Sequence, residues 1–232
     1  MAREVCFDCE TTGFDWMHGD RIIEIGAVEI IDDRITDKSL HLYINPDGKI
    51  IPKSAFEVHK ISNHFLEDKP KFGEVAKQLT DFFGDSLVVA HNGQDFDFPF
   101  LNYELKQAGL PEIPKNQLAD SIIIARGRVF GPKSYSLDAL AKWFGISLET
   151  RTEGHGAIID ARILANIYLE LTKMNDAETY DEMKDRFRKA VQNLPRNGEG
   201  RAKREFLPSA DDTAAFQASL EKSVTNAMWN QE

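Results

Sequence analysis

The sequence lacks any apolar run that approaches the roughly 20 residues needed for a membrane-spanning helix. Its first residues, MAREVCFDCE, also lack the basic and then apolar layout of a secretory signal. Of its 232 residues, 42% are hydrophobic and 28% are charged, which excludes the composition typical of disordered chains. We therefore expect a folded, cytoplasmic protein.

Cysteine is scarce: the chain has only Cys6 and Cys9, in a C-x-x-C spacing. Redox and zinc sites place this spacing at a turn or a helix start, and no second cysteine pair is present to complete a zinc ligand set. Here the pair lies in residues 4–10, which have the pattern of a β-strand. Side chains three residues apart on a strand point to opposite faces, so the two sulfurs would not meet. The pattern favours two small apolar strand residues over a metal or redox site.

Local patterns predict a mixed sheet flanked by helices, and so an α/β fold. Alternating and apolar runs indicate strands at residues 3–10, 21–31, 40–44 and 86–90. The polar stretch 31–34 supplies a hairpin turn, so the first three strands should form an antiparallel meander. Apolar residues three and four apart indicate helices at 72–83, 100–108 and 137–144, the last capped by Ser136 and ended by Gly145. A final helix is expected to open at Asp160.

The character of the sequence changes after about residue 172. Residues 184–204 are basic and carry Pro195, Gly198 and Gly200, which is typical of a linker. Helical spacing of apolar residues returns at 209–229. We therefore expect a main domain at 1–172 and a linker with a helical tail at 173–232.

Asp8 and Glu10 lie two residues apart on the first predicted strand, so both carboxylates should face the same side. A solvent-facing strand edge is the simplest explanation of such a pair. Val5 and Phe7 indicate instead a buried strand, where two unpaired neighbouring carboxylates would repel each other. A bridging divalent cation removes this cost, and hard carboxylate oxygens without a Cys or His ligand set favour Mg²⁺ or Mn²⁺.

Two further acidic positions follow later in the chain. Asp95 and Asp97 come after the strand at 86–90, where either could cap the next helix. Asp160 could likewise be a helix N-cap. His155 precedes it in a polar, glycine-containing loop, where a histidine can be exposed and mobile. Each position alone has an ordinary structural explanation, but their joint occurrence with the first carboxylate pair predicts a catalytic cluster.

Three stretches, FDCETTG, HNGQDFDFPFLNYEL and HGAIIDARILANIYLEL, resemble in order and spacing the three motifs of the DEDDh 3′→5′ exonuclease superfamily. Within it, the chain is most similar to the proofreading branch that serves bacterial DNA polymerase III. The resemblance covers roughly residues 4–172 and implies a ribonuclease H-like fold with a mixed five-stranded sheet, followed by a C-terminal helical tail. It also implies hydrolysis of phosphodiester bonds from DNA 3′ ends, with release of nucleoside 5′-monophosphates.

The resemblance assigns the metal ligands to Asp8, Glu10, Asp97 and Asp160, and the general base to His155. Two ions, Mg²⁺ or Mn²⁺, would hold the scissile phosphate, one generating the nucleophile and the other stabilising the leaving oxygen. Neutral His155 would take a proton from the attacking water. The chain carries one extra residue after His91-Asn92, so Asp95 is the alternative to Asp97.

The resemblance also implies residues that touch the nucleotide. His59 resembles a residue that contacts the terminal nucleotide, although Ser54 stands where the family has an acidic residue. Phe96 would line the nucleotide pocket, although packing in the hydrophobic core explains this residue nearly as well. The remaining pocket residues are expected among the first and third motifs, so that the full set is Asp8, Glu10, Thr11, Thr12, His59, Phe96 and Asp160.

The net negative charge of the chain indicates which partners it needs to bind DNA. The chain has 28 Lys+Arg against 38 Asp+Glu, and residues 172–232 hold 10 of the former and 11 of the latter, so the excess acidity lies in residues 1–171. Phosphates are normally bound by Lys and Arg, so this part of the chain is a poor electrostatic trap for DNA. We therefore expect a partner that holds the DNA, a replicative polymerase catalytic subunit bound through residues 173–232; a self-packed helix pair is the alternative for this tail. Residues 192–196, QNLPR, match a sliding-clamp motif poorly and give clamp binding little support.

Two other functions compete with proofreading. The first is a free-standing DEDDh exonuclease that trims RNA or single-stranded DNA. The second is a structural partner whose nuclease site is vestigial, which five intact site residues argue against.

Overall fold

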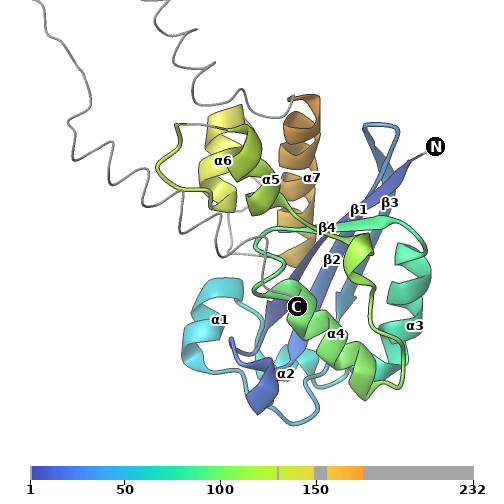
Figure 1. Cartoon of the computed structure of the whole chain (residues 1–232). Helices are drawn as coiled ribbons and strands as arrows, with labels where there is room; N and C mark the ends of the chain where they lie inside the picture. Colours follow the sequence, from blue (N-terminus) through green and yellow to red (C-terminus); the bar gives the residue numbers. More distant parts are fainter. Residues whose placement is uncertain (1, 130, 149–155, 175–232) are drawn as a thin grey trace, which may run out of the picture. The chain divides into compact units, whose positions relative to one another are not determined.

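The computed structural model describes residues 2–129, 131–148 and 156–174, and contains a five-stranded sheet of order β3-β2-β1-β4-β5 (Figure 1). Strands β1 (Arg3–Thr11), β2 (Ile22–Ile31) and β3 (Arg34–Tyr43) are antiparallel. Strands β4 (Leu87–Ala90) and β5 (Leu118–Asp120) run parallel to β1. The expected α/β class with a mixed five-stranded sheet is confirmed. No helix among the described residues is long and apolar enough to cross a membrane.

The predicted antiparallel meander is confirmed, and the turn between β2 and β3 shows why it contains aspartates. Asp32 and Asp33 both have positive φ, which aspartate tolerates better than β-branched residues. The third strand was predicted too short: β3 begins at Arg34 rather than residue 40. It lies at the edge of the sheet and its first half is polar and partly exposed, so the apolar pattern used for the prediction is absent there.

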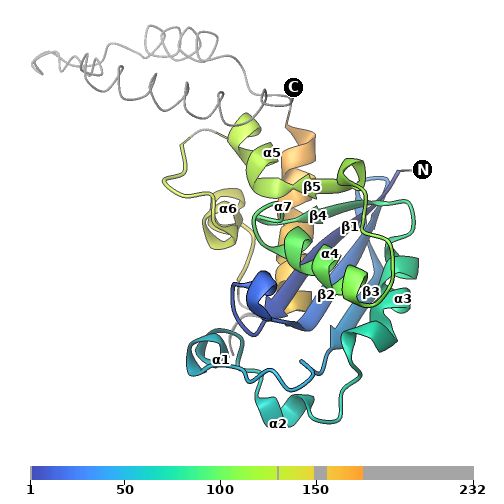
Figure 2. The ribbon, with the colours of Figure 1, turned by 60° about the horizontal axis from the view of Figure 1, so that its bottom comes forward.

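Side chains along the strands alternate between two hydrophobic cores, one on each face of the sheet. Val5, Phe7 and Cys9 pack on one face with α3 (Phe72–Phe83) and α4 (Asp97–Gln107). Cys6 packs on the other face with α5 (Ser121–Arg128), α6 (Leu137–Phe144) and α7 (Ala157–Lys173). In Figure 2, α4 and α7 lie on opposite sides of the sheet. The two cysteines are therefore buried, free and on opposite faces, as the strand pattern predicted.

The helices at 72–83 and 137–144 begin and end as predicted. Ser136 Oγ accepts the backbone N–H of Ala139, and Gly145 ends α6 in the left-handed conformation. The last helix was predicted to open at Asp160, but α7 begins three residues earlier, with Gly156 as its N-cap. Asp160 therefore lies inside the helix, and its backbone N–H donates to the carbonyl of Gly156.

Strand β5, helix α5 and four shorter helical elements have no counterpart among the strand and helix ranges predicted from the sequence. α1 (Lys53–His59) and α2 (Asn63–Leu66) pack through a small separate core around Ile23. The turns η1 (Trp16–His18) and η2 (Lys115–Gln117) follow β1 and precede β5. The elements α1, α2, η1 and η2 are each seven residues or fewer, too short to show a helical period in the sequence.

Candidate active site

Strand β1 presents Asp8 and Glu10 on the face of the sheet that α7 covers. Alternation along the strand puts Cys6, Asp8 and Glu10 on this face and Cys9 on the other. Both carboxylate residues are half-buried. The prediction that the two side chains share one face is confirmed.

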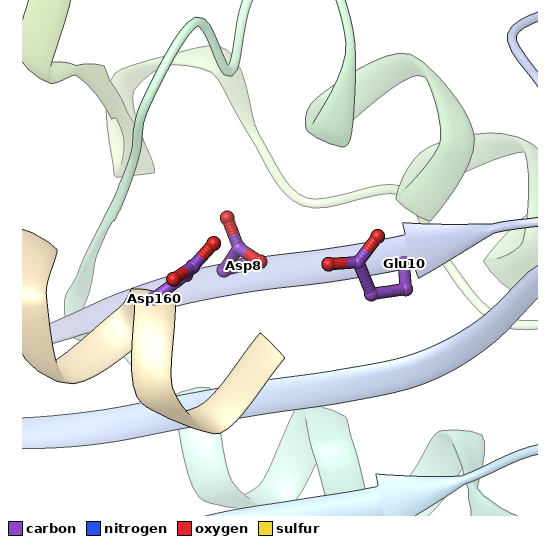
Figure 3. A group of neighbouring side chains, drawn as sticks. All are labelled: Asp8, Glu10 and Asp160. Carbon is purple, nitrogen blue, oxygen red and sulfur yellow. The ribbon is translucent and has the colours of Figure 1, made fainter. Parts of the chain in front are cut away.

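Helix α7 brings Asp160 to the same place. One carboxylate oxygen from each of Asp8, Glu10 and Asp160 lies within 4.8 Å of the others. Figure 3 shows the two strand carboxylates and the helix carboxylate around one space. Asp160 is only 3% exposed and does not cap the helix, so the capping explanation of this residue is wrong.

Asp97 is the first residue of α4 and approaches the cluster from the far side of β1. Its Oδ1 accepts the backbone N–H of Cys9 at 3.2 Å and the thiol of Cys9 at 3.3 Å. The N-cap of α4 is Phe96, so Asp97 does not cap this helix. Asp97 is 2% exposed, whereas Asp95 is exposed to solvent. The structure thus places Asp97, and not Asp95, beside the strand that carries Asp8.

The crowding of acids has a clear electrostatic signature. Burial raises the pKa of Asp8 well above its ordinary value, and the charges of Asp97, Asp160 and Glu10 raise it further. Burial also raises the pKa of Asp97 to about 7, although the hydrogen bonds from Cys9 oppose this change. These carboxyl groups are therefore costly to ionise together without a compensating positive charge.

A divalent cation fits this donor set. A cation whose oxygen ligands lie about 2.0–2.5 Å away holds ligand atoms roughly 4–5 Å apart or closer, which the three clustered oxygens satisfy. The donors are all carboxylates, which Mg²⁺ and Mn²⁺ prefer over softer ligands. Cys9 faces away from this cluster, and its thiol pKa is raised by burial and then by Asp97, so it is a poor thiolate ligand.

His59 ends α1 and is buried with one nitrogen unused. Its Nδ1 accepts the backbone N–H of Ile61 at 3.0 Å, and its Nε2 has no hydrogen-bond partner among the described residues. Burial lowers the pKa of His59, so the neutral ring carries its proton on Nε2. A buried donor without a partner is rare in native proteins, and a ligand would satisfy it. Ser54 is exposed on the same helix.

The other residues predicted to line the nucleotide pocket have partners within the protein. Thr11 donates its hydroxyl to the carbonyl of Gly13, and Thr12 donates to Asp20 at 3.1 Å. Both threonines are buried. Phe96 is half-buried, and its ring contacts those of Phe14 and Phe100. Packing therefore accounts for the buried part of the Phe96 ring. The hydroxyls of Thr11 and Thr12 hold the loop after β1 in shape.

His155 and the tail at 175–232 lie outside the described residues. The helix that follows His155 begins two residues later, at Ala157. The predicted linker, docking helix and clamp-like stretch of residues 192–196 belong to the same undescribed part of the chain.

Sequence reasoning missed two buried acids that support the cluster. Asp120 accepts the backbone N–H groups of Gln94 and Ile122, and so ties the loop before Asp97 to the start of α5. Glu24, on β2, accepts the backbone N–H of Ala157 at 3.1 Å. The sequence signal for Glu24 was its place in the apolar strand RIIEIGAVEII, where a charged residue needs a partner.

Comparison with known proteins gives a consistent result. The family model described as Exonuclease, RNase_T, matches residues 5–168. The DNA polymerase III subunit epsilon of Rickettsia felis is 42% identical over 173 residues, which cover 73% of this chain and 74% of the relative. The DNA polymerase III subunit epsilon of Escherichia coli K12 is 41% identical over 180 residues, which cover 74% and 72%.

Solved structures of exonucleases share the fold. Exonuclease X in complex with 5′ overhanging duplex DNA has a TM-score of 0.57 and 26% identity, and the match covers 80% of this chain and 98% of that one. Escherichia coli exonuclease I with a dA16 oligonucleotide has a TM-score of 0.63 at 15% identity, covering 75% and 41%. The second likeness shows the fold alone, and it agrees with the ribonuclease H-like fold that the sequence motifs implied.

Proposed function

This chain belongs to the exonuclease family and is a 3′→5′ exonuclease; on that premise we propose that it proofreads DNA as a subunit of a replicative polymerase. The observation that carries the proposal is the convergence of Asp8, Glu10 and Asp160 within 4.8 Å. Relatives that cover about three quarters of the chain and are named DNA polymerase III subunit epsilon support the polymerase role.

Asp8, Glu10, Asp97 and Asp160 would hold two divalent cations, Mg²⁺ or Mn²⁺. When bound, such ions supply a nucleophile from water and neutralise charge at the scissile phosphate. The carboxylates fix the position of that charge, because three of them are held by β1 and α7 and the fourth by its bonds to Cys9. His155 would accept the proton of the attacking water.

His59 and the loop after β1 would hold the terminal nucleotide. The buried Nε2 of His59 is free to donate to an oxygen of the substrate. Phe96 would offer an apolar surface to the base, next to the largely exposed ring of Phe14. Thr11 and Thr12 would act through their bonds to Gly13 and Asp20, which hold the loop after β1 in shape.

The choice of substrate is tested with the pure full-length chain, Mn²⁺ and two oligonucleotides. A primer labelled at its 3′ end and mismatched there is expected to lose its label as a nucleoside 5′-monophosphate, faster than a matched primer does. An RNA of the same sequence is expected to be degraded more slowly. Faster degradation of RNA would favour the free-standing trimming enzyme, and release from neither would favour a vestigial site.

We also propose that residues 173–232 bind the polymerase catalytic subunit. The acidity of the rest of the chain makes it a weak DNA binder by itself, so a partner that carries the DNA would compensate. In a pull-down, the full chain is expected to retain the catalytic subunit and residues 1–174 alone are expected to lose it. Equal retention by both would place the contact elsewhere. Preserved exonuclease activity of residues 1–174 on single-stranded DNA is the folding control.

A further inference from the structure

Glu24 is a buried acid that the proposed reaction does not use directly. It lies on β2, opposite Glu10 in the register of the sheet, and is 2% exposed. Both of its oxygens have partners: Oε1 pairs with His41 Nε2 at 2.6 Å, and Oε2 accepts the backbone N–H of Ala157 at 3.1 Å. The side chain therefore joins β2 and β3 to the first residue of α7.

Its contact on α7 lies at the first residue of the helix. The first backbone N–H groups of a helix have no partner within the helix, and an acceptor with negative charge stabilises this end. Gly156, the N-cap, has no side chain that could supply such an acceptor. Glu24 supplies it from the neighbouring strand.

Gly26 allows the helix to come this close. A Cβ atom on Gly26 would lie 2.2 Å from the carbonyl carbon of Ala157 and 2.3 Å from the backbone nitrogen of Ile158. Gly26 is also directly opposite Asp8 in the register of β1 and β2. The backbone of the first turn of α7 thus rests on the strand next to the one that carries Asp8.

We infer that Glu24 is a positioning residue for the nuclease site: by holding the N–H of Ala157, it fixes the first turn of α7 so that Asp160 reaches Asp8 and Glu10. The inference rests on the proposed function, because it treats these three carboxylates as cation ligands. Asp160 lies one helical turn after Ala157, so the contact at Ala157 lies close to the carboxylate that it would position.

The test compares two acids on the same strand. Glu29 is also on β2, is 1% exposed and is paired with Arg3 at 2.7 Å, but its partners lie away from α7. Glu24→Ala and Glu29→Ala each remove a buried carboxylate and its pairing with a basic side chain, so both are expected to lower the unfolding temperature. Only Glu24→Ala is expected to change the cation site.

Mn²⁺ binding by the full chain is measured by calorimetry without DNA, and kcat and KM are measured on a single-stranded oligonucleotide. Removing a residue that supports metal ligands typically weakens metal binding or activity by roughly 10–100-fold, and we expect this loss in Mn²⁺ affinity and in kcat for Glu24→Ala. KM is expected to stay near the wild-type value. Glu24→Gln keeps an acceptor for the N–H of Ala157. Its Mn²⁺ affinity and kcat are expected to lie between those of Glu24→Ala and the wild type.

Gly26→Ala provides an independent variant, because it displaces α7 while Glu24 stays intact. It is expected to weaken Mn²⁺ binding, because the position of α7 sets that of Asp160. If Glu24→Ala does not fold, Glu24→Gln decides the role of Glu24: Mn²⁺ affinity and kcat equal to those of the wild type would overturn it. Mn²⁺ affinity and kcat in Glu24→Ala that equal those of Glu29→Ala would overturn the positioning role while the wild-type exonuclease stands. A wild-type chain that neither binds Mn²⁺ nor degrades DNA would overturn the proposed site and this inference together.

Discussion

An Asp8→Asn chain is expected to release nucleotides from DNA 3′ ends about 10³-fold or more slowly than the wild type, while keeping its fold. Asp8 is central among the acids: the charges of Asp97, Asp160 and Glu10 all act on it. Losing it removes a ligand from any cation held there, and such cations contribute several kcal/mol to the transition state. Single-turnover release of a 3′ label, measured at saturating Mn²⁺, gives the rate.

The same variant is expected to be more stable than the wild type when cations are removed. The pKa of Asp8 is raised in the folded state, so the folded wild type holds this proton more tightly than the unfolded chain does. The stability linked to that proton is present at low pH and is lost as pH rises through the folded pKa. Asparagine carries no charge and avoids this loss. In chelator, the unfolding temperature of Asp8→Asn should therefore exceed that of the wild type at about pH 8 and approach it at low pH.

Adding Mn²⁺ should reverse this order of unfolding temperatures, because only the intact site gains stability from the ion. Asp81→Asn is the matched control, since Asp81 is exposed and paired with Lys77 on α3.

The same assay of 3′-label release, applied to Asp97→Asn and Asp95→Asn, separates the two assignments of the second motif. Asp97→Asn is expected to be inactive and Asp95→Asn to be active. A fully active Asp8→Asn chain would refute the ligand set.

A His155→Ala chain is expected to lose about 10²–10⁴-fold in kcat, the usual contribution of a general base. The wild-type rate is expected to fall as pH drops below the ordinary pKa of a histidine, about 6.5, because a protonated imidazole cannot accept a proton. His155→Ala should lose this acid limb and respond less to pH. Its Mn²⁺ affinity should stay close to that of the wild type, unlike that of Asp8→Asn.

The control is His64→Ala, because His64 is exposed on α2 and pairs only with Glu67 among the described residues. It is expected to keep both the rate and the acid limb. If His155→Ala retains the acid limb with a normal rate, another group accepts the proton.

The sequence predicted the parts of the fold that bury a clear apolar pattern. Helix α3 buries Phe72, Val75 and Leu79 in period, and its ends were predicted correctly. The three residues of β5 and the two short helices before α3 could not be found this way, because they contain too few residues to show a period. Their positions are set by tertiary contacts, such as the small core around Ile23.

The acidic residues of the candidate site could be predicted from the sequence, but the contacts that hold them in place could not. Asp8 and Glu10 follow from strand alternation, and Asp97 and Asp160 from motif resemblance. Their local roles were not predictable: both looked like helix caps, yet the caps are Phe96 and Gly156. The contacts that place them involve residues far away in sequence, such as the bond from Cys9 to Asp97, which spans 88 positions. No local pattern encodes such a distance.

The order of the site along the chain has a consequence for biosynthesis. The acids on β1 leave the ribosome first, and the helix that carries Asp160 is the last described element to emerge. Because α7 packs on the same face of the sheet as these acids, a nascent chain without it has only part of the cluster. We therefore expect a chain that ends before α7 to lack nuclease activity, because it lacks the carboxylate of Asp160.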